Sequence, residues 1–596
     1  MRFVWAVAAF VLAALMIATG IAQRTVFQGP ESETTTVADS AAASYTLIDG
    51  AVLNRLPGSQ TLRAAQEGSV FAAYGRTADV KAWLADTRYT AVTVDDGGRV
   101  RSSTVEPSAG TEPQHRNPAG SDLWLDQFQQ DDVLVQHLQL PASMSVLVAT
   151  DGTKPAPATI TVTWPVERST PWAGPLIVGG GILMAVGVFL YILGIRKLRR
   201  SRGPRRKSLP PLPETEPIDL SVEASRKGVI TAGKSPRAAK AGRVRGFVAL
   251  PVLTAGALLF AGCSADAWPQ LGATPTPTPT ETVVDQGGAQ PPAVTEGQAT
   301  TILSRISATV AKADETKDAA LAATRLEGAA LAERKTNYAL RGKIKDESAL
   351  PAIPGAGLKV ILPQAYAGWP RAVMLVAEQR SGDNVASNIL MIGQKDPWSP
   401  YRLSYVGQLE AEKLPEVAPA YVGAAAVQPD SSFLVMPPAA IAAAYADVID
   451  KGAKSRHAAE FSTGDDVFLK GVAAKRKEQL AEFNKTAKKT GKLTFAAAAG
   501  GEPPAALATL ESGAIVAVNV DETETVKPTD DDAVIKLEKN PRVRALTGVK
   551  ESQTGVTTTY SDQLFFYVPG VGSGDAQIRL LGYSSNILGA KVVSKK

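Results

Sequence analysis

The residues that could take part in chemistry are few and scattered along this chain. The single cysteine, Cys263, has no second cysteine with which to form an intramolecular disulfide. Three histidines, His115, His137 and His457, are too far apart to form HExxH or another local zinc motif. The acidic run at residues 530–532 lacks the glycine and spaced carboxylates of a calcium loop, and it is typical of a solvated turn. The sequence therefore predicts no metal site, no bound cofactor and no catalytic residue.

Cys263 nevertheless lies at the end of an apolar run, residues 247–262. As a helix this run would be about 24 Å long, which is short for a hydrocarbon core of about 30 Å. Two arginines precede it and small residues end it, as in a secretory signal.

The ending Leu-Leu-Phe-Ala-Gly-Cys resembles the lipobox of bacterial lipoproteins, in which the cysteine is lipidated after cleavage. Ala261, Gly262 and Cys263 match that motif, but Phe260 stands where Leu, Val or Ile is usual, and the segment is internal. Two alternatives follow for residues 246–263. Either Cys263 is lipidated and the chain is cut before it, or the run is an unprocessed third membrane anchor.

Two further apolar segments are long enough to cross a bilayer, which takes about 20 apolar residues. Residues 1–24 are either a span or a cleaved signal, and the single charge before the apolar run, Arg2, favours the span. Residues 173–195 form the second span. They contain Gly181 and Ala185, whose spacing would allow close packing against another membrane helix, but the favoured interpretation is that glycine is simply common in membrane helices.

Residues 196–245 separate the second and third apolar segments and hold 15 Lys or Arg against 4 Asp or Glu. Such an excess beside a membrane span marks the cytoplasmic side, and the proline-rich, charged composition predicts disorder. Because the whole chain has a net charge of only +5, the rest of it is net acidic. The predicted partners are therefore membrane lipid and other envelope proteins, with no nucleic acid. Both large polar portions are expected outside the cytoplasm at the plasma membrane.

The first of these portions, residues 25–172, is predicted to be β-rich. Short apolar runs recur between turn signals, and Ile160, Val162 and Trp164 alternate with threonines as in a half-buried strand. Sandwich and barrel both remain open. Residues 264–297 are rich in Pro and Thr, and they are typical of an extended linker.

The second portion is predicted to contain two α+β units, residues 298–430 and 431–596. Each opens with helical spacing of apolar residues, such as Ile302, Ile306 and Val310, and continues with a run of strands. This order resembles the cystatin-like cone of the nuclear transport factor superfamily, in which a curved sheet wraps a helix. The module order and Ala-rich composition also resemble uncharacterised envelope proteins of actinobacterial type.

The cone resemblance implies a pocket at the open end of the sheet. Candidate lining residues in the first unit, each better interpreted as core or rim packing, are Tyr338, Tyr366, Trp369, Asp383, Trp398 and Tyr405. Without a catalytic signature, the sequence favours a non-enzymatic, membrane-anchored envelope protein with a binding or scaffolding role. The alternative is a pocket-based enzyme or a carrier of lipid or glycan.

Overall fold

The computed structural model describes residues 2–27, 30–38, 40–107, 114–166, 171–200, 290–381, 384–530, 532–574 and 577–594. The predicted basic segment beyond residue 200, the third apolar segment with Cys263, the Pro/Thr-rich linker up to residue 289, and Asp383 and Asp531 lie outside these residues. Contacts divide the chain into two compact units. One contains residues 1–32 and 166–280, and the other contains residues 33–165 and 281–596.

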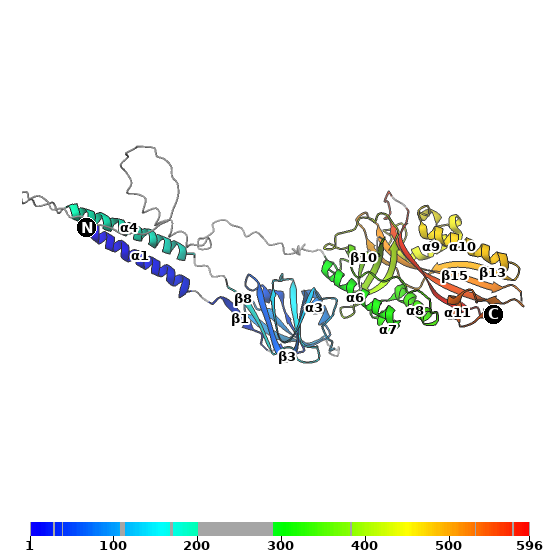
Figure 1. Ribbon diagram of the computed structural model, residues 1–596, viewed down its shortest axis with the longest axis horizontal. Helices are drawn as coiled ribbons and strands as arrows, with labels where there is room; N and C mark the ends of the chain where they lie inside the picture. The colour runs from blue at the N-terminus through cyan, green and yellow to red at the C-terminus, as the bar shows by residue number, and fades with distance from the viewer. Residues whose placement is uncertain are drawn as a thin grey trace, which may run out of the picture. The chain divides into compact units, whose positions relative to one another are not determined.

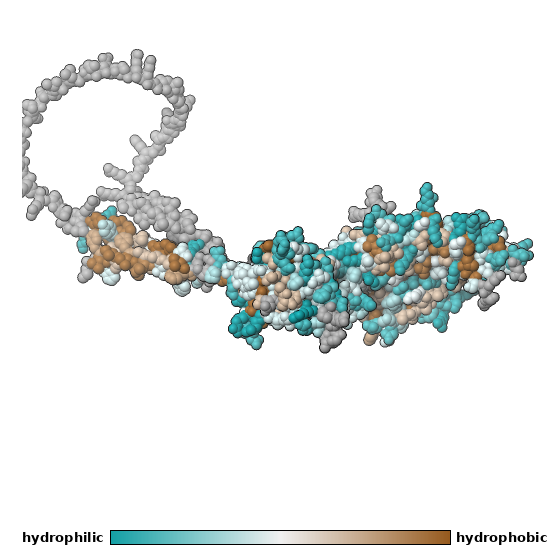
Figure 2. All heavy atoms as spheres, turned by 90° about the horizontal axis from the view of Figure 1, so that it is seen from below, coloured by the Kyte–Doolittle hydropathy of each residue, from teal (hydrophilic) through white to brown (hydrophobic). Residues whose placement is uncertain are grey.

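The first unit holds two helices that are long and apolar enough to cross a membrane, α1 (Arg2–Thr25) and α4 (Ala173–Arg200). They pack antiparallel, since Phe3 lies against Tyr191 near one end, with ring centroids 5.6 Å apart, and Gly20 lies against Ile177 near the other. Apolar side chains cover most of the described surface of the pair that is visible in Figure 2. A mostly apolar exterior suits a hydrocarbon solvent.

Three glycines of α4, spaced seven residues apart, lie against α1. A Cβ added at Gly180 would lie 2.6 Å from Ile17 and 3.0 Å from the carbonyl oxygen of Ala13, and Gly187 and Gly194 lie similarly close to phenylalanine rings. A Cβ at Gly181 would meet nothing within 4 Å. Gly181 therefore does not lie on the face of α4 that packs against α1. The heptad spacing of Gly180, Gly187 and Gly194 marks the packed face instead.

Replacement of Gly180 by leucine should weaken the pairing of α1 with α4. The new side chain would overlap the backbone of α1, and overpacking of this kind costs roughly 1–3 kcal/mol. We expect less cross-linking between cysteines placed at Phe3 and Tyr191, measured with a short bifunctional reagent. Gly181→Leu is the matched control and should leave the yield unchanged, whereas equal yields from both variants would contradict this packing.

The β-rich domain lies between α1 and α4 in the sequence. It is one eight-stranded sheet that curls on itself (Figure 1). It is therefore a single curled sheet and not a sandwich of two sheets. Its strand order is β1-β8-β3-β7-β2-β4-β5, and β6 pairs with the other side of β3. The elements are β1 (Ser32–Thr36), β2 (Tyr45–Ile48), α2 (Gly50–Leu53), β3 (Gln60–Arg76), α3 (Thr77–Trp83), β4 (Tyr89–Val94), β5 (Val100–Val105), β6 (Asp126–Leu138), β7 (Met144–Ala149) and β8 (Thr159–Pro165).

The alternation of side chains along these strands separates two apolar clusters. Ile48, Val148 and Trp164 belong to the cluster that several strands enclose, in agreement with the alternation read from the sequence around Trp164. The opposite face of β2, β3 and β7 is covered by α3, through residues such as Trp83. Trp369, from the C-terminal domain, also packs there.

The C-terminal domain contains one nine-stranded sheet, and in each half of the domain the helices come before the strands in the sequence. The strand order of the sheet is β13-β15-β18-β19-β12-β11-β10-β9, and β14 pairs with β15. The elements are α6 (Glu296–Thr316), α7 (Ala319–Ala323), α8 (Gly328–Lys343), β9 (Leu358–Pro363), β10 (Arg371–Ser381), β11 (Asn384–Gln394), β12 (Arg402–Leu409), α9 (Pro438–Lys451), α10 (Val467–Thr486), β13 (Gly491–Ala499), β14 (Ala505–Ala508), β15 (Ala514–Pro528), β16 (Ile535–Lys536), α11 (Pro541–Thr547), β17 (Glu551–Ser552), β18 (Val556–Val568) and β19 (Arg579–Val592).

Residues 298–430 and 431–596, which the sequence predicts as two units, thus share one sheet. The halves join where β12 and β19 pair through Gln408↔Tyr583 and Leu409↔Gly582. Directly paired residues point to the same side of a sheet. The register therefore places Leu390, under the first-half helices, on the same face as Leu564, under α9.

A third apolar cluster, which includes Phe565, covers the opposite face and draws residues from both halves. A shared sheet with a shared core on one face makes the region a single domain.

Local sequence explains how the helices of the first half are placed. Thr295 and Gln298 form a reciprocal capping box that starts α6, whose buried Ile302, Ile306 and Val310 follow at helical spacing. Just before α8, Leu326 forms a parallel bridge with Leu403 of β12. This bridge fixes the start of α8 beside the sheet.

Candidate functional site

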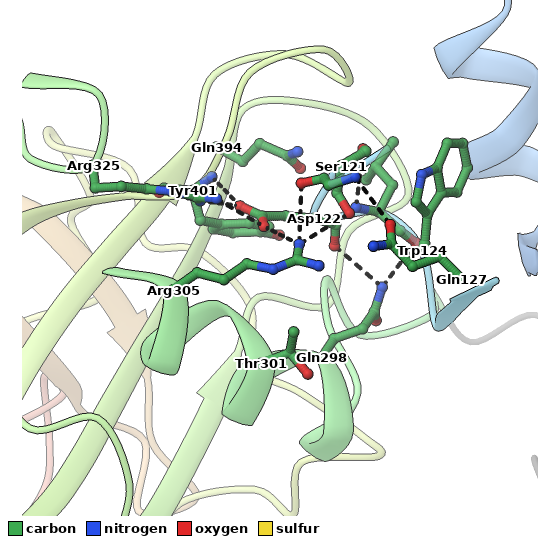
Figure 3. Close-up of polar contacts among 12 residues, drawn as sticks. Ser121, Asp122, Trp124, Gln127, Gln298, Thr301, Arg305, Arg325, Gln394 and Tyr401 are labelled. Carbon is green, nitrogen blue, oxygen red and sulfur yellow. Dashed lines mark hydrogen bonds and ion pairs between the residues drawn. The ribbon is translucent and has the colours of Figure 1, made fainter. Parts of the chain in front are cut away.

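Two features could carry function, and both lie in the compact unit that contains the β-rich domain and the C-terminal domain. The first feature is the interface between these two domains. Asp122, in the loop before β6, is fully buried and accepts ion-pair contacts from Arg305 of α6, at 2.9 Å, and from Arg325 (Figure 3). Its Oδ2 also accepts a hydrogen bond of 2.9 Å from the backbone N–H of Tyr401. The amide of Gln298 donates to the carbonyl oxygen of Leu123 at 2.9 Å. One short loop therefore binds three separate segments of the C-terminal domain.

A second buried ion pair crosses the same interface. Nη2 of Arg371, at the start of β10, lies 2.6 Å from Oδ1 of Asp79 in α3, and the two side chains are 0% and 4% exposed. The guanidinium of Arg371 also lies over the ring of Trp369, 3.9 Å from its centroid. Because these charges are shielded from water, loss of one partner would leave the other charged and buried, which costs about 3–5 kcal/mol.

Aromatic residues complete the interface around Arg116. Its guanidinium forms a bidentate pair with Asp86 at 2.6–2.7 Å and lies 4.9 Å from the ring centroid of Trp398. The indole N–H of Trp398 in turn donates to the carbonyl oxygen of Trp83 at 2.9 Å. Buried ion pairs, fitted aromatic rings and backbone hydrogen bonds together describe a specific, stable interface.

The second feature is a cavity of about 330 Å³ in the C-terminal domain. It lies where β12 and β19 diverge. These strands share only two paired positions and then separate. Gly407 and Gln408 line it on one strand, and Ser584 and Asn586 line it on the other. Glu333 of α8 closes it. A volume of this size lies at the small end of the range of about 300–1,000 Å³ typical of ligand sites.

Glu333 is the buried carboxyl group that lines this cavity. Only 2% of the residue is exposed, and Oε2 accepts a hydrogen bond of 2.7 Å from the amide of Asn586. Oε1 has no hydrogen-bond partner within the described part of the chain. Burial raises the pKa of Glu333 to about 7, since the charged form loses its hydration. Near neutral pH this carboxyl can therefore both donate and accept hydrogen bonds.

Asp562 of β18 is a second buried carboxyl group. It is fully buried, and burial together with the charge of Glu522 raises its pKa to about 8. Glu522 itself pairs with Arg476 of α10 at 2.6 Å. Asp562 is thus held largely protonated near neutral pH.

The predicted pocket residues do not converge on one site. Tyr338 donates to Asp314 at 2.7 Å and is buried, as is Tyr405, which donates to the carbonyl oxygen of Pro503. Trp369 and Trp398 lie at the interface with the β-rich domain, and Tyr366 is partly exposed. The interpretation of these side chains as packing residues agrees with their surroundings.

The other sequence candidates also remain apart. His115 contacts the carbonyl oxygen of Gly152, His137 contacts Thr61, and His457 pairs with Glu460. Across the described ranges, no group of His, Cys, Asp and Glu side chains could hold a metal ion. Cys263 lies outside them, so its proposed lipidation stays a prediction.

Sequence reasoning did not single out the buried charged residues of the interface, Asp79, Asp122 and Arg371. It also missed Glu333 of the cavity and Asp562, whose charge interacts with that of Glu333. A local signal exists for Asp562, because it interrupts the apolar pattern of a strand that continues Leu-Phe-Phe. Asp122, in a polar loop, gives no such signal. Its burial comes from a partner domain far away in the sequence.

Residues 290–592, just over half of the chain, match the family described as "Domain of unknown function (DUF8094)". The match covers almost all of the described C-terminal domain and ends within β19. No curated protein and no solved structure matches the chain. The resemblance to cystatin-like folds and the actinobacterial origin therefore stay predictions.

Proposed function

The chain belongs to the DUF8094 family, and we propose that it is a membrane-anchored cell-envelope protein with a binding or scaffolding role. In this proposal α1 and α4 cross the plasma membrane. The β-rich domain and the C-terminal domain together form one head on the extracytoplasmic side.

The observation that carries the proposal is the buried interface between the two domains. The β-rich domain lies between α1 and α4 in the sequence, and the C-terminal domain follows α4. Asp122 and Asp79 contact arginines of the C-terminal domain in a water-shielded interface, which supports a shared compartment for the two domains. If α4 crosses the membrane, the chain has to return across it between residues 200 and 290.

The apolar run at residues 247–262 is the sequence feature that could achieve this return. As a third span it would place the C-terminal domain beside the β-rich domain. As a processed lipoprotein signal it would export that domain and anchor it through Cys263. Both alternatives end with the same head on the same side, and the basic residues 196–245 favour the cytoplasm for the other side.

Binding is favoured over catalysis by the surroundings of Glu333. A carboxyl with a pKa near 7 suits general acid–base chemistry, but catalysis also needs a second reacting group within hydrogen-bond reach. The neighbouring amides of Asn586 and Gln563 and the hydroxyl of Ser561 lower the pKa of this carboxyl in part, and none of these groups is a general acid or base near neutral pH. A carrier of a small ligand is the second candidate, because the cavity has the volume for one.

Cysteine labelling in intact cells tests the proposed location. We expect a membrane-impermeant maleimide to label both Asp96→Cys, on the β-rich domain, and Glu412→Cys, on the C-terminal domain, since both positions are exposed. Ser208→Cys, in the basic segment, should react only after lysis, and the unaltered chain reports any background from Cys263. Labelling of only one domain would contradict the shared compartment. Shielding of both domains until lysis would reverse the orientation.

A further inference from the structure

We infer that the cavity between α8 and the diverging strands β12 and β19 binds a neutral, polyhydroxylated ligand about the size of one sugar residue. This inference rests on the proposed binding role and deepens it by assigning a site and a ligand class. It draws on three observations about the cavity: its uncharged polar lining, its unpaired buried acceptor, and the commitment of its cation to other partners.

The polar lining of the cavity consists mainly of amides and hydroxyls. The side-chain amides of Gln379, Asn388 and Gln408 lie in this lining, and Ser584 and Ser585 add hydroxyl groups that also contact Asn586 and Asp562. Amides and hydroxyls both donate and accept hydrogen bonds. A ligand with several adjacent hydroxyl groups has the same double capacity, whereas an apolar ligand would leave these groups unpaired.

Glu333 provides a directional acceptor at the buried end of the cavity. Its Oε2 accepts a hydrogen bond from Asn586. Its Oε1 makes no hydrogen bond of normal geometry among the described residues, although the side chains of Gln563 and Ser561 lie near the carboxyl and lower its pKa. A ligand hydroxyl would give Oε1 a full hydrogen bond. Tyr583 also lines the cavity, and its ring packs against Phe468 with centroids 5.0 Å apart.

The charges of the cavity disfavour an anionic ligand. Arg334 is the cation among the lining residues, and its guanidinium is already bound to the carboxylate of Asp314 and to the carbonyl oxygen of Pro351. A phosphate or carboxylate would therefore meet Glu333 and Glu410 without a free cation to balance them.

The test is a binding titration with the full chain in lipid nanodiscs, because detergents with sugar headgroups would compete. The probes are D-glucose, N-acetyl-D-glucosamine and myo-inositol, with inorganic phosphate and choline as charged comparators. Ligand-observed NMR should detect saturable binding of at least one neutral probe and no saturable binding of either charged one.

Two variants locate the site. Glu333→Gln should weaken binding about tenfold, as expected for loss of a hydrogen bond to a charged acceptor. Ala386→Trp should abolish binding by filling the cavity from an exposed position on β11, without disturbing the core. Glu412→Gln is the matched control at an exposed glutamate and should bind like the unaltered chain.

The inference is overturned if none of the neutral probes binds saturably, if phosphate or choline binds instead, or if Ala386→Trp binds unchanged. These outcomes are separate from those of the labelling experiment. Loss of sugar binding with both domains still labelled in intact cells would refute the ligand assignment alone. Failure of the labelling with sugar binding retained would refute the location alone.

Discussion

Replacement of Asp122 by alanine should separate the β-rich domain from the C-terminal domain. The carboxylate is fully buried and pairs with Arg305 and Arg325, so its removal leaves two guanidinium groups facing a space with no counterion. Breaking a buried ion pair by removing one partner costs about 3–5 kcal/mol. We therefore expect a single thermal unfolding transition of the head to become two, measured by calorimetry in nanodiscs.

Hydrogen exchange provides a second, local measurement of the same change. The amide N–H of Tyr401 donates to Asp122 and should lose its protection in Asp122→Ala, together with the backbone of residues 120–124. Asp96→Asn is the control, because this aspartate is exposed in the same domain. An Asp122→Ala protein with unchanged transitions and unchanged protection at Tyr401 would show that the ion pairs do not hold the domains together.

Much of the local structure could be predicted from the sequence, since local patterns determine it. The helix with Ile302, Ile306 and Val310 and the strand with Ile160, Val162 and Trp164 both follow from residue spacing. The two apolar helices follow from length and composition alone. Each of these features depends on residues within one element.

Features that join distant parts of the chain could not be predicted in this way. The pairing of Gln408 with Tyr583 merges the two predicted units into one sheet. The sequence of each strand does not specify which other strand it pairs with. The same holds for Asp122, whose two arginines lie in α6 and in the segment before α8. Trp369 and Trp398 were expected to pack, but the surface against which they pack belongs to another domain.

The cavity and the interface have one structural cause in common, which is the placement of the segment between α7 and α8. Arg325 binds Asp122 of the β-rich domain, while Leu326 forms a bridge with Leu403 near the start of β12. Two residues further on, α8 begins and carries Glu333 to the cavity. Docking of the β-rich domain therefore helps to fix the helix that closes the cavity. Separation of the domains is expected to loosen that helix as well.

The stability of the C-terminal domain should fall as pH rises from about 5 to 8, and Asp562→Asn should remove much of that dependence. Burial raises the pKa of Glu333 to about 7 and that of Asp562 to about 8, so the folded domain holds protons that the unfolded chain has already released. The stability that these groups contribute is fully present below the unfolded pKa values, near 4, and is lost as pH rises through the folded ones. The slope is about 1.4 kcal/mol per pH unit for each group.

Other carboxyls do not reverse this trend in the same window. Glu315, Asp447 and Glu482 of the C-terminal domain have pKa values lowered by neighbouring side chains, so they are ionised in both the folded and the unfolded state above about pH 5. The thermal unfolding midpoint of the head, measured at intervals from pH 5 to 8, should therefore decline in the unaltered chain and decline less in Asp562→Asn. The variant should be the more stable protein near pH 8, because its buried amide carries no charge. Asp465→Asn, at an exposed position of the same domain, should follow the unaltered chain. A midpoint that rises with pH in both the unaltered chain and Asp562→Asn would mean that Asp562 is ionised in the folded domain.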